Sequence, residues 1–312
     1  PSLVQADDGT LWAVWYSYRF SNGDIWYKTS SDDGTTWSAA VRLTADMEYD
    51  YDPAITQTAD GTLWVVWYSY RSGNPDLWYK TSSDGGATWS ADTQLTTYTG
   101  SDYDPSIAQT ADGTLWAVWY SYRSGNPDIW CKTSSDGGIT WSADTQLTTD
   151  TGDDYDPAIA QTADGILWVV WTSYRSGNAD LWYKTSSDSG ATWSGEERWT
   201  QFVGYDYDPS VATLSDGSMA VAWYSDRSSN YDVWFGIYGR REDVDPPPHV
   251  AWIENDPGPS PSYEDVVTFR AQARDETAVA TVYLVWDLNG VAQADALMYD
   301  DGAHNDYGAG DG

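Results

Sequence analysis

Five arginines recur at the same position of a repeated phrase, and they are the first candidates for chemistry in this sequence. The phrase reads WYSYRSGNPD in two of its copies, where the arginines are Arg71 and Arg123. A guanidinium that follows an aromatic strand can bind the carboxylate of a substrate, or it can neutralise an acidic side chain of the protein itself. The full set is Arg19, Arg71, Arg123, Arg175 and Arg227, spaced by 52 residues.

Acidic side chains recur at the same interval, in an Asp-Tyr-Asp motif. The first aspartates are Asp50, Asp102, Asp154 and Asp206, and the second are Asp52, Asp104, Asp156 and Asp208. A proline follows each second aspartate, so that residue is expected to be extended and to direct the chain into the next strand.

These residues belong to a repeat whose pattern is that of short β-strands. In the second copy, AITQT, LWVVWYSY, DLWYKTS and WSADTQLT are expected strands, separated by glycine-containing turns. Four antiparallel strands in about fifty residues make one blade of a β-propeller. The predicted propeller spans residues 1–243, with blades 1–52, 53–104, 105–156, 157–208 and 209–243.

The ends of the propeller leave its closure open. The fifth copy has three expected strands, and Asp245 and a run of three prolines stand where its last turn and outer strand should follow. Either five blades close with a strand donated from before Pro1, or further blades precede it. We favour five blades, and we expect the chain to be part of a longer protein.

The turn SSDGGATW fits the pattern Ser-x-Asp-x-Gly-x-x-Trp and occurs four times. Its hydroxyl and carboxylate can accept turn N–H groups, its glycine can adopt positive φ, and its tryptophan can cover the hairpin. The motif residues are Asp32, Asp84, Asp136 and Asp188, with Trp37, Trp89, Trp141 and Trp193. The turn resembles the Asp-box of sialidase-like (BNR-repeat) β-propellers over residues 1–241. That resemblance implies a structural turn away from the active face.

In a propeller, the arginines and the Asp-Tyr-Asp motifs should meet on one face. Sialidases of the resembled fold use three arginines from different blades, a tyrosine nucleophile assisted by a glutamate, and an aspartate acid/base, so their blades must differ. Here the blades are nearly alike. We therefore interpret the five arginines with Asp52, Asp104, Asp156 and Asp208 as a ring of structural ion pairs, within a blade or across a blade boundary. A repeated contact to a sugar is the alternative.

After the prolines the pattern changes to that of a second module. HVAWIEN, DVVTFRAQARD, TVYLVWDLNG and ADALMYDDG are expected strands of an Ig-like or fibronectin-III-like sandwich over residues 244–312, cut short at Gly312. Its tail could supply oxygen ligands to Ca²⁺, although a solvated Asp/Gly turn is the alternative. The residues are Asp300, Asp301, Asn305, Asp306 and Asp311. No cofactor is otherwise required.

Composition limits the partners. The chain has 48 acidic and 15 basic residues, a net charge of −33, which disfavours nucleic acid and anionic membranes. No apolar run has the length of a membrane span. The single cysteine, Cys131, stands where other copies have tyrosine or phenylalanine and is interpreted as a packing residue.

The resulting hypothesis is a non-catalytic extracellular or cell-surface protein. It would be a structural or adhesive unit that contacts copies of itself, other surface proteins or glycans. A multivalent, lectin-like carbohydrate-binding propeller is the alternative, and a sialidase-type glycoside hydrolase the second.

Overall fold

The fold is a β-propeller, as the repeat predicted. The computed structural model describes residues 1–19, 22–214, 217–226 and 232–238, together with the backbone of four strands between 267 and 298. In these residues every regular element is a β-strand, and none is a helix with the length and apolarity of a membrane span.

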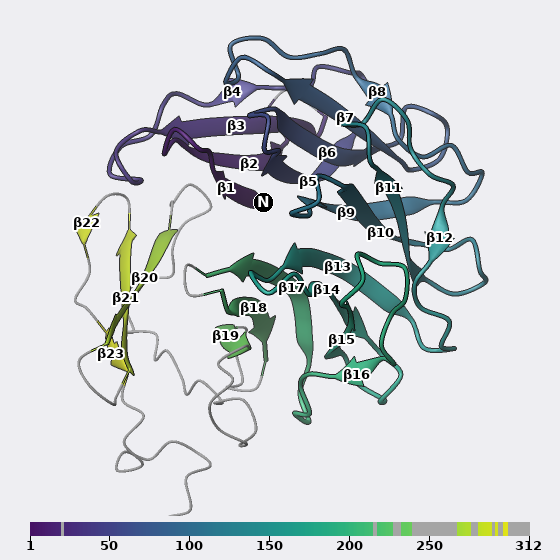
Figure 1. The fold of residues 1–312 in the computed structure, drawn as a ribbon. Coiled ribbons are helices and arrows are strands. Elements are labelled where there is room, and N and C mark those ends of the chain that lie inside the picture. Colours follow the sequence, from purple (N-terminus) through teal and green to yellow (C-terminus); the bar gives the residue numbers. More distant parts are fainter. Residues whose placement is uncertain are drawn as a thin grey trace, which may run out of the picture.

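Four blades have four strands and the fifth has three, each in chain order from the axis outward (Figure 1). Blade 1 comprises β1 (Ser2–Gln5), β2 (Leu11–Ser17), β3 (Asp24–Ser30) and β4 (Val41–Arg42). Blade 2 comprises β5 (Asp50–Gln57), β6 (Leu63–Ser69), β7 (Asp76–Ser82) and β8 (Thr93–Gln94). Blade 3 comprises β9 (Asp102–Gln109), β10 (Leu115–Ser121), β11 (Asp128–Ser134) and β12 (Thr145–Gln146). Blade 4 comprises β13 (Asp154–Gln161), β14 (Leu167–Ser173), β15 (Asp180–Ser186) and β16 (Glu197–Arg198). Blade 5 comprises β17 (Asp206–Thr213), β18 (Met219–Ser225) and β19 (Asp232–Tyr238).

Blades stack face to face through their second strands. The strand LWVVWYS is buried along nearly its whole length because both of its faces pack on a neighbouring blade, as a continuous apolar run predicts. One hydrophobic cluster fills each of the four boundaries between consecutive described blades. Trp67, Trp119 and Trp171 are fully buried in these clusters. Cys131 is also buried there, as expected for a packing residue.

A further sheet is formed by β20 (Val267–Asp275), β21 (Ala280–Leu288), β22 (Val291–Ala292) and β23 (Ala296–Met298). The boundary at 243 and the tail residues Asp300, Asp301, Asn305, Asp306 and Asp311 lie outside the described residues. The Ig-like module and its calcium site therefore stay predictions.

The inner strands of blades 2 to 5 begin earlier than the sequence suggested, because the Asp-Tyr-Asp motif pairs with the second strand. In blade 2, Asp50 lies opposite Ser69 and Tyr51 opposite Tyr68, and the register then shifts before Ala54. The same shift occurs in blades 3, 4 and 5. A β-bulge of this kind redirects a side chain at the rim of a sheet.

Candidate functional site

The arginine of blade 3 is held in a closed network of ion pairs. Arg123 donates from Nη2 to both carboxylate oxygens of Asp102, at 2.6 and 2.7 Å, and from Nη1 to Asp144 at 2.6 Å. Its Nε donates to Ser121 Oγ at 2.9 Å. The arginine side chain is 5% exposed and that of Asp102 is fully buried. Such bidentate, charge-assisted contacts fix the guanidinium in place.

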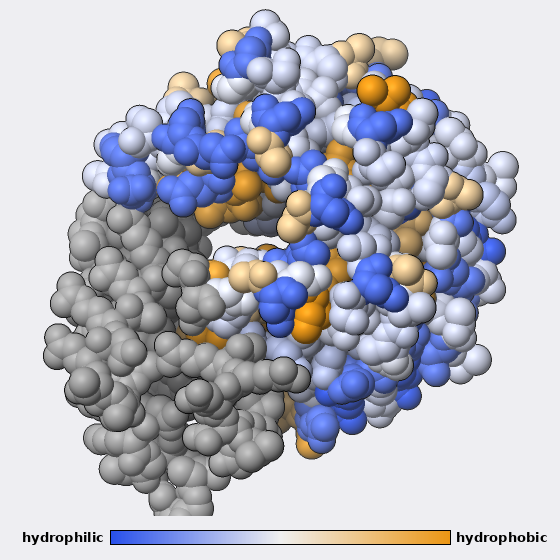
Figure 2. All heavy atoms as spheres, viewed as in Figure 1, coloured by the Kyte–Doolittle hydropathy of each residue, from blue (hydrophilic) through white to orange (hydrophobic). Residues whose placement is uncertain are grey.

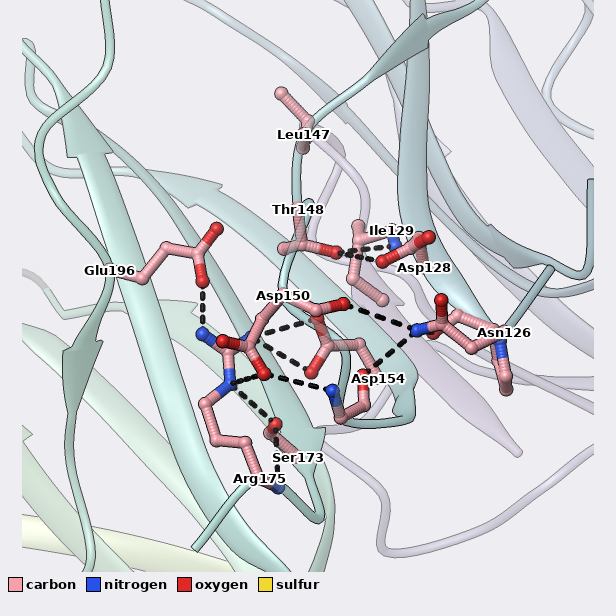
Figure 3. A network of polar contacts seen from close by, with 12 residues as sticks. Asn126, Asp128, Ile129, Leu147, Thr148, Asp150, Asp154, Ser173, Arg175 and Glu196 are labelled. Carbon is pink, nitrogen blue, oxygen red and sulfur yellow. Dashed lines mark hydrogen bonds and ion pairs between the residues drawn. The ribbon is translucent and has the colours of Figure 1, made fainter. Parts of the chain in front are cut away.

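Blades 2 and 4 repeat this arrangement. Arg71 pairs with Asp50 and Asp92. In blade 4, shown in Figure 3, Arg175 pairs with Asp154 and Glu196. Burial raises the pKa of Asp50 and Asp154, and hydrogen bonds from serine and the arginine charge oppose that rise.

Aromatic rings also surround these guanidinium groups. The Cζ atom of Arg123 lies 4.7 Å from the Trp130 ring centroid and 4.5 Å from that of Tyr98. Arg19 lies 4.9 Å from the ring centroid of Trp26, so blade 1 repeats the stacking. Arg227 lies outside the described residues. The described ion-pair networks of Arg71, Arg123 and Arg175 occupy these guanidiniums internally and stabilise their own blades.

The second aspartates are not the partners of these arginines, which corrects the expected pairing. The arginines of blades 2, 3 and 4 take the first aspartate of each motif instead, because that residue begins the same sheet. Asp52, Asp104, Asp156 and Asp208 instead lie toward one another near the axis. The expectation of an extended backbone is also wrong: all four adopt left-handed φ, between 43° and 52°. Aspartate tolerates this conformation better than most residues, and the bulge requires it.

Together these four side chains form an axial carboxylate row, defined as Asp52, Asp104, Asp156 and Asp208. The carboxyl of Asp104 hydrogen-bonds to those of Asp52 and Asp156, and Asp156 also hydrogen-bonds to Asp208. Burial, and then the charge of Asp52, raise the pKa of Asp104 to about 7. Burial and the contact with Asp208 raise the pKa of Asp156. Carboxyls this close cannot all be charged, so the row holds protons near neutral pH.

Tyrosines surround the row. Tyr68 lies near the charges of Asp52 and Asp104, and Tyr120 near those of Asp104 and Asp156; burial raises the pKa of both phenols, and these charges raise it further. In blades 1 to 4, an exposed tyrosine follows the second strand. These are Tyr18, Tyr70, Tyr122 and Tyr174, with exposed fractions from 38% to 56%. The described blades surround a hollow at the centre of the molecule (Figure 2). The site is therefore an acidic centre with an aromatic rim.

The Asp-box residues have a different place and role. In blade 2, Asp84 accepts hydrogen bonds from Ser82 Oγ at 2.8 Å and from Thr88 N at 2.9 Å. Hydrogen bonds from the side chain and backbone of Thr88 lower the pKa of this exposed carboxylate to about 2. Trp89 packs on Trp12 of the preceding blade, with ring centroids 6.1 Å apart. Blades 1, 3 and 4 repeat the turn with Asp32, Asp136 and Asp188. The turn therefore stabilises the hairpin and packs it on its neighbour.

No metal centre was found among the described residues: no group of three or more histidine, cysteine, aspartate or glutamate side chains there could hold an ion. Repeated blades with Asp-box turns place the protein among the Asp-box β-propellers, and in this chain the axis of the propeller carries the axial carboxylate row. Residues 9–244 match the BNR repeat-like domain family, and the chain belongs to that family.

The chain is similar to several characterised or solved proteins. A sialidase from Bacteroides fragilis is 25% identical over 242 residues, which cover 63% of this chain and 43% of the relative, so the chain spans less than half of that protein. A Dyadobacter fermentans protein of unknown function has a TM-score of 0.69 and 14% identity, covering 94% of this chain and 92% of its own. A Penicillium chrysogenum α-L-arabinanase complexed with arabinobiose has a TM-score of 0.56 and 17% identity, covering 75% and 79%.

These comparisons correct the expectation that the protein is not an enzyme. The chain is similar in sequence to the Bacteroides fragilis sialidase and shares its fold with the Penicillium chrysogenum α-L-arabinanase, so this fold is one on which glycoside hydrolases are built. Near-identical blades are therefore not evidence against an enzyme. The aspartate before the proline in blades 2 to 5 was predicted as a site residue, but its contact with the equivalent aspartates of the other blades was not predicted.

Proposed function

We propose that this protein binds and hydrolyses neutral glycans at the axial carboxylate row. Hydrolysis of a glycosidic bond needs one carboxyl that donates a proton to the leaving oxygen and another that acts as base or nucleophile. The observation that carries the proposal is Asp104, whose raised pKa of about 7 keeps it largely protonated below neutral pH. That is the state required of a general acid.

The second carboxyl would come from the other end of the row. Adjacent carboxyls are in hydrogen-bond contact, which leaves no space between them for a sugar or a water. Asp208 is separated from Asp104 by Asp156 and is exposed to solvent. We therefore assign Asp208 the role of base, which activates water, and Asp104 the role of acid.

The charge of the site favours a neutral substrate. An acidic sugar would be repelled by the row, and Arg71, Arg123 and Arg175 already bind protein carboxylates. The exposed tyrosines offer flat apolar faces and hydroxyl groups, which suit the faces and edges of neutral sugar rings. This reasoning favours an arabinan-like or other uncharged polysaccharide over a sialoside.

The proposal is tested by measuring the release of reducing ends from neutral polysaccharides, including arabinan. A sialoside serves as the comparison substrate. Asp104→Asn should abolish turnover while the variant stays folded. Asp84→Asn makes the same chemical change on an exposed Asp-box carboxylate and should leave turnover intact. Full turnover by Asp104→Asn, or cleavage of the sialoside alone, would contradict the assignment.

A glycan-binding propeller without turnover is the second candidate. The repetition of Tyr18, Tyr70, Tyr122 and Tyr174 around one face favours it, since weak equivalent contacts gain avidity on a polymer. Binding to neutral glycans that weakens stepwise as these tyrosines are replaced by alanine, with no hydrolysis, would select this function. The acidity of the chain is the reason for also proposing an extracellular setting, with surface proteins or further copies as partners.

A further inference from the structure

A tyrosine of the third strand packs on a tryptophan of the second strand in blades 1, 2 and 4. The ring centroids of Trp12 and Tyr27 lie 5.1 Å apart, and those of Trp64 and Tyr79 lie 4.9 Å apart. In blade 4 the distance from Trp168 to Tyr183 is 5.2 Å. The phenol ring thus fills one defined space beside each tryptophan.

Blade 3 keeps this backbone and lacks the ring. Cys131 pairs with Thr145 across β11 and β12, in the same register in which Tyr79 pairs with Thr93. A pocket of about 340 Å³ opens there, lined among others by Trp116, Cys131, Thr145, Gln146, Lys184 and Trp193. The pocket lies between blades 3 and 4, on different residues from the axial carboxylate row.

The tryptophans that would contact a ring in this pocket are already in place. Trp116 is 4% exposed and its ring centroid lies 5.8 Å from that of Trp193, in the edge-to-face geometry that Trp64 and Trp141 adopt around Tyr79. Trp116 also contacts the turn of blade 4 at Gly190, so its ring is held on that side. The walls are therefore preorganised for an aromatic occupant.

We propose that this pocket is a binding site for a small para-substituted phenol. The phenol would lie against Trp116 as the Tyr79 ring lies against Trp64, and its hydroxyl would bond to Thr145, as that of Tyr79 bonds to Thr93. A cavity of about 150 Å³ is enough for benzene, so the larger volume here leaves room for the para substituent. Burial raises the pKa of Cys131 to about 12, so its thiol is a neutral wall beside the ring.

The site can be tested by titrating the whole protein with p-cresol and measuring binding by ligand-detected NMR. Wild type and Cys131→Ala should bind one p-cresol saturably. Cys131→Tyr, which installs the residue of the sister blades, should weaken binding by at least about tenfold. Unchanged affinity in Cys131→Tyr would overturn the proposal, and so would competition of methyl glucoside for the same site at equal concentration.

A second variant moves the site and keeps the test decisive if Cys131→Tyr does not fold. Tyr79→Cys gives blade 2 the side chain of blade 3 and should raise the stoichiometry of p-cresol from one to two. A stoichiometry that stays at one in a folded Tyr79→Cys protein would show that the missing ring does not create the site.

Discussion

The motif glycine of the Asp-box turn in blades 2 to 4 should not tolerate a side chain, whereas the residue before it should. A Cβ built on Gly86 would lie 2.1 Å from Cη2 and 2.8 Å from Cζ2 of Trp12 in the preceding blade. Gly85 also has positive φ, at 65°, but a Cβ there would meet nothing within 4 Å. Asp33 and Ser189 occupy the position of Gly85 in other blades with φ near 55°, so the chain itself shows that this position accepts side chains.

The two substitutions therefore separate backbone strain from steric overlap. Left-handed backbone costs an alanine about 1–2 kcal/mol, and this applies to both Gly85→Ala and Gly86→Ala. Only Gly86→Ala also forces the Trp12 ring from 2.1 Å toward the 3.4 Å at which ordinary contact begins. Trp12 is 5% exposed and packs on Tyr27 and Trp89, so it cannot move freely. Overpacking adds about 1–3 kcal/mol, for a total of about 2–5 kcal/mol.

Urea unfolding followed by tryptophan fluorescence measures both free energies under the same conditions. Gly86→Ala should lower the free energy of unfolding by at least about 1 kcal/mol more than Gly85→Ala. Gly138→Ala and Gly137→Ala repeat the comparison in blade 3, because a Cβ on Gly138 would lie 2.1 Å from Trp64. Equal losses for the two members of each pair would refute the claim that the turn packs as a rigid element on the preceding blade.

Three further perturbations probe the ion pairs, the axial carboxylate row and the buried threonines. Arg123→Met leaves the fully buried Asp102 without its partner and should cost about 3–5 kcal/mol, whereas adding Asp102→Asn should recover part of the loss in a double-mutant cycle. Strict additivity would contradict the pairing. Because the folded pKa of Asp104 is about 7 against 3.8 in the unfolded chain, the folded state binds the extra proton, and stability falls as pH rises between these values. The melting temperature should therefore fall less between about pH 5 and about pH 8 in Asp104→Asn than in the wild type, and Asp84→Asn should behave as the wild type does. An unchanged pH profile in Asp104→Asn would refute the raised pKa of Asp104. Thr148→Val removes the oxygen that accepts the Ile129 N–H at 2.9 Å and should cost about 1–3 kcal/mol, while the exposed neighbour change Thr149→Val should be nearly neutral in the same unfolding assay.

The fold could be predicted because its signals are local. The apolar run LWVVWYS indicates a strand, the Asp-Gly pairs indicate hairpins and the 52-residue period indicates a repeat, all without knowledge of distant contacts. The outer strand was overestimated: WSADTQLT suggested eight residues, but only Thr93–Gln94 pair in β8. Trp89 belongs to the Asp-box turn and Asp92 pairs with Arg71, while Ser90 and Leu95 keep single backbone hydrogen bonds to the third strand, at Thr81 and Leu77.

The site could not be predicted in the same way, because it depends on which of two neighbouring aspartates faces the arginine. Asp50 and Asp52 are equivalent in type and separated by one tyrosine, so alternation places them on the same side of an ideal strand. The bulge changes this. It puts Asp52 in a left-handed conformation and directs it to the axis, while Asp50 stays in register with Ser69 and reaches Arg71. Periodicity alone contains no signal for that shift.

Near-identical blades can place equivalent residues in unequal surroundings, as the axial carboxylate row shows. Asp104 and Asp156 are identical in sequence context to Asp52 and Asp208, but each has a carboxyl on both sides, whereas Asp208 is exposed at one end. Burial, and then the contacts and charges within the row, raise the pKa values of Asp104 and Asp156. An acid and a base can thus arise from copies of one residue. Under the proposed function, catalysis would not require unlike blades, because the copies converge on a shared axis.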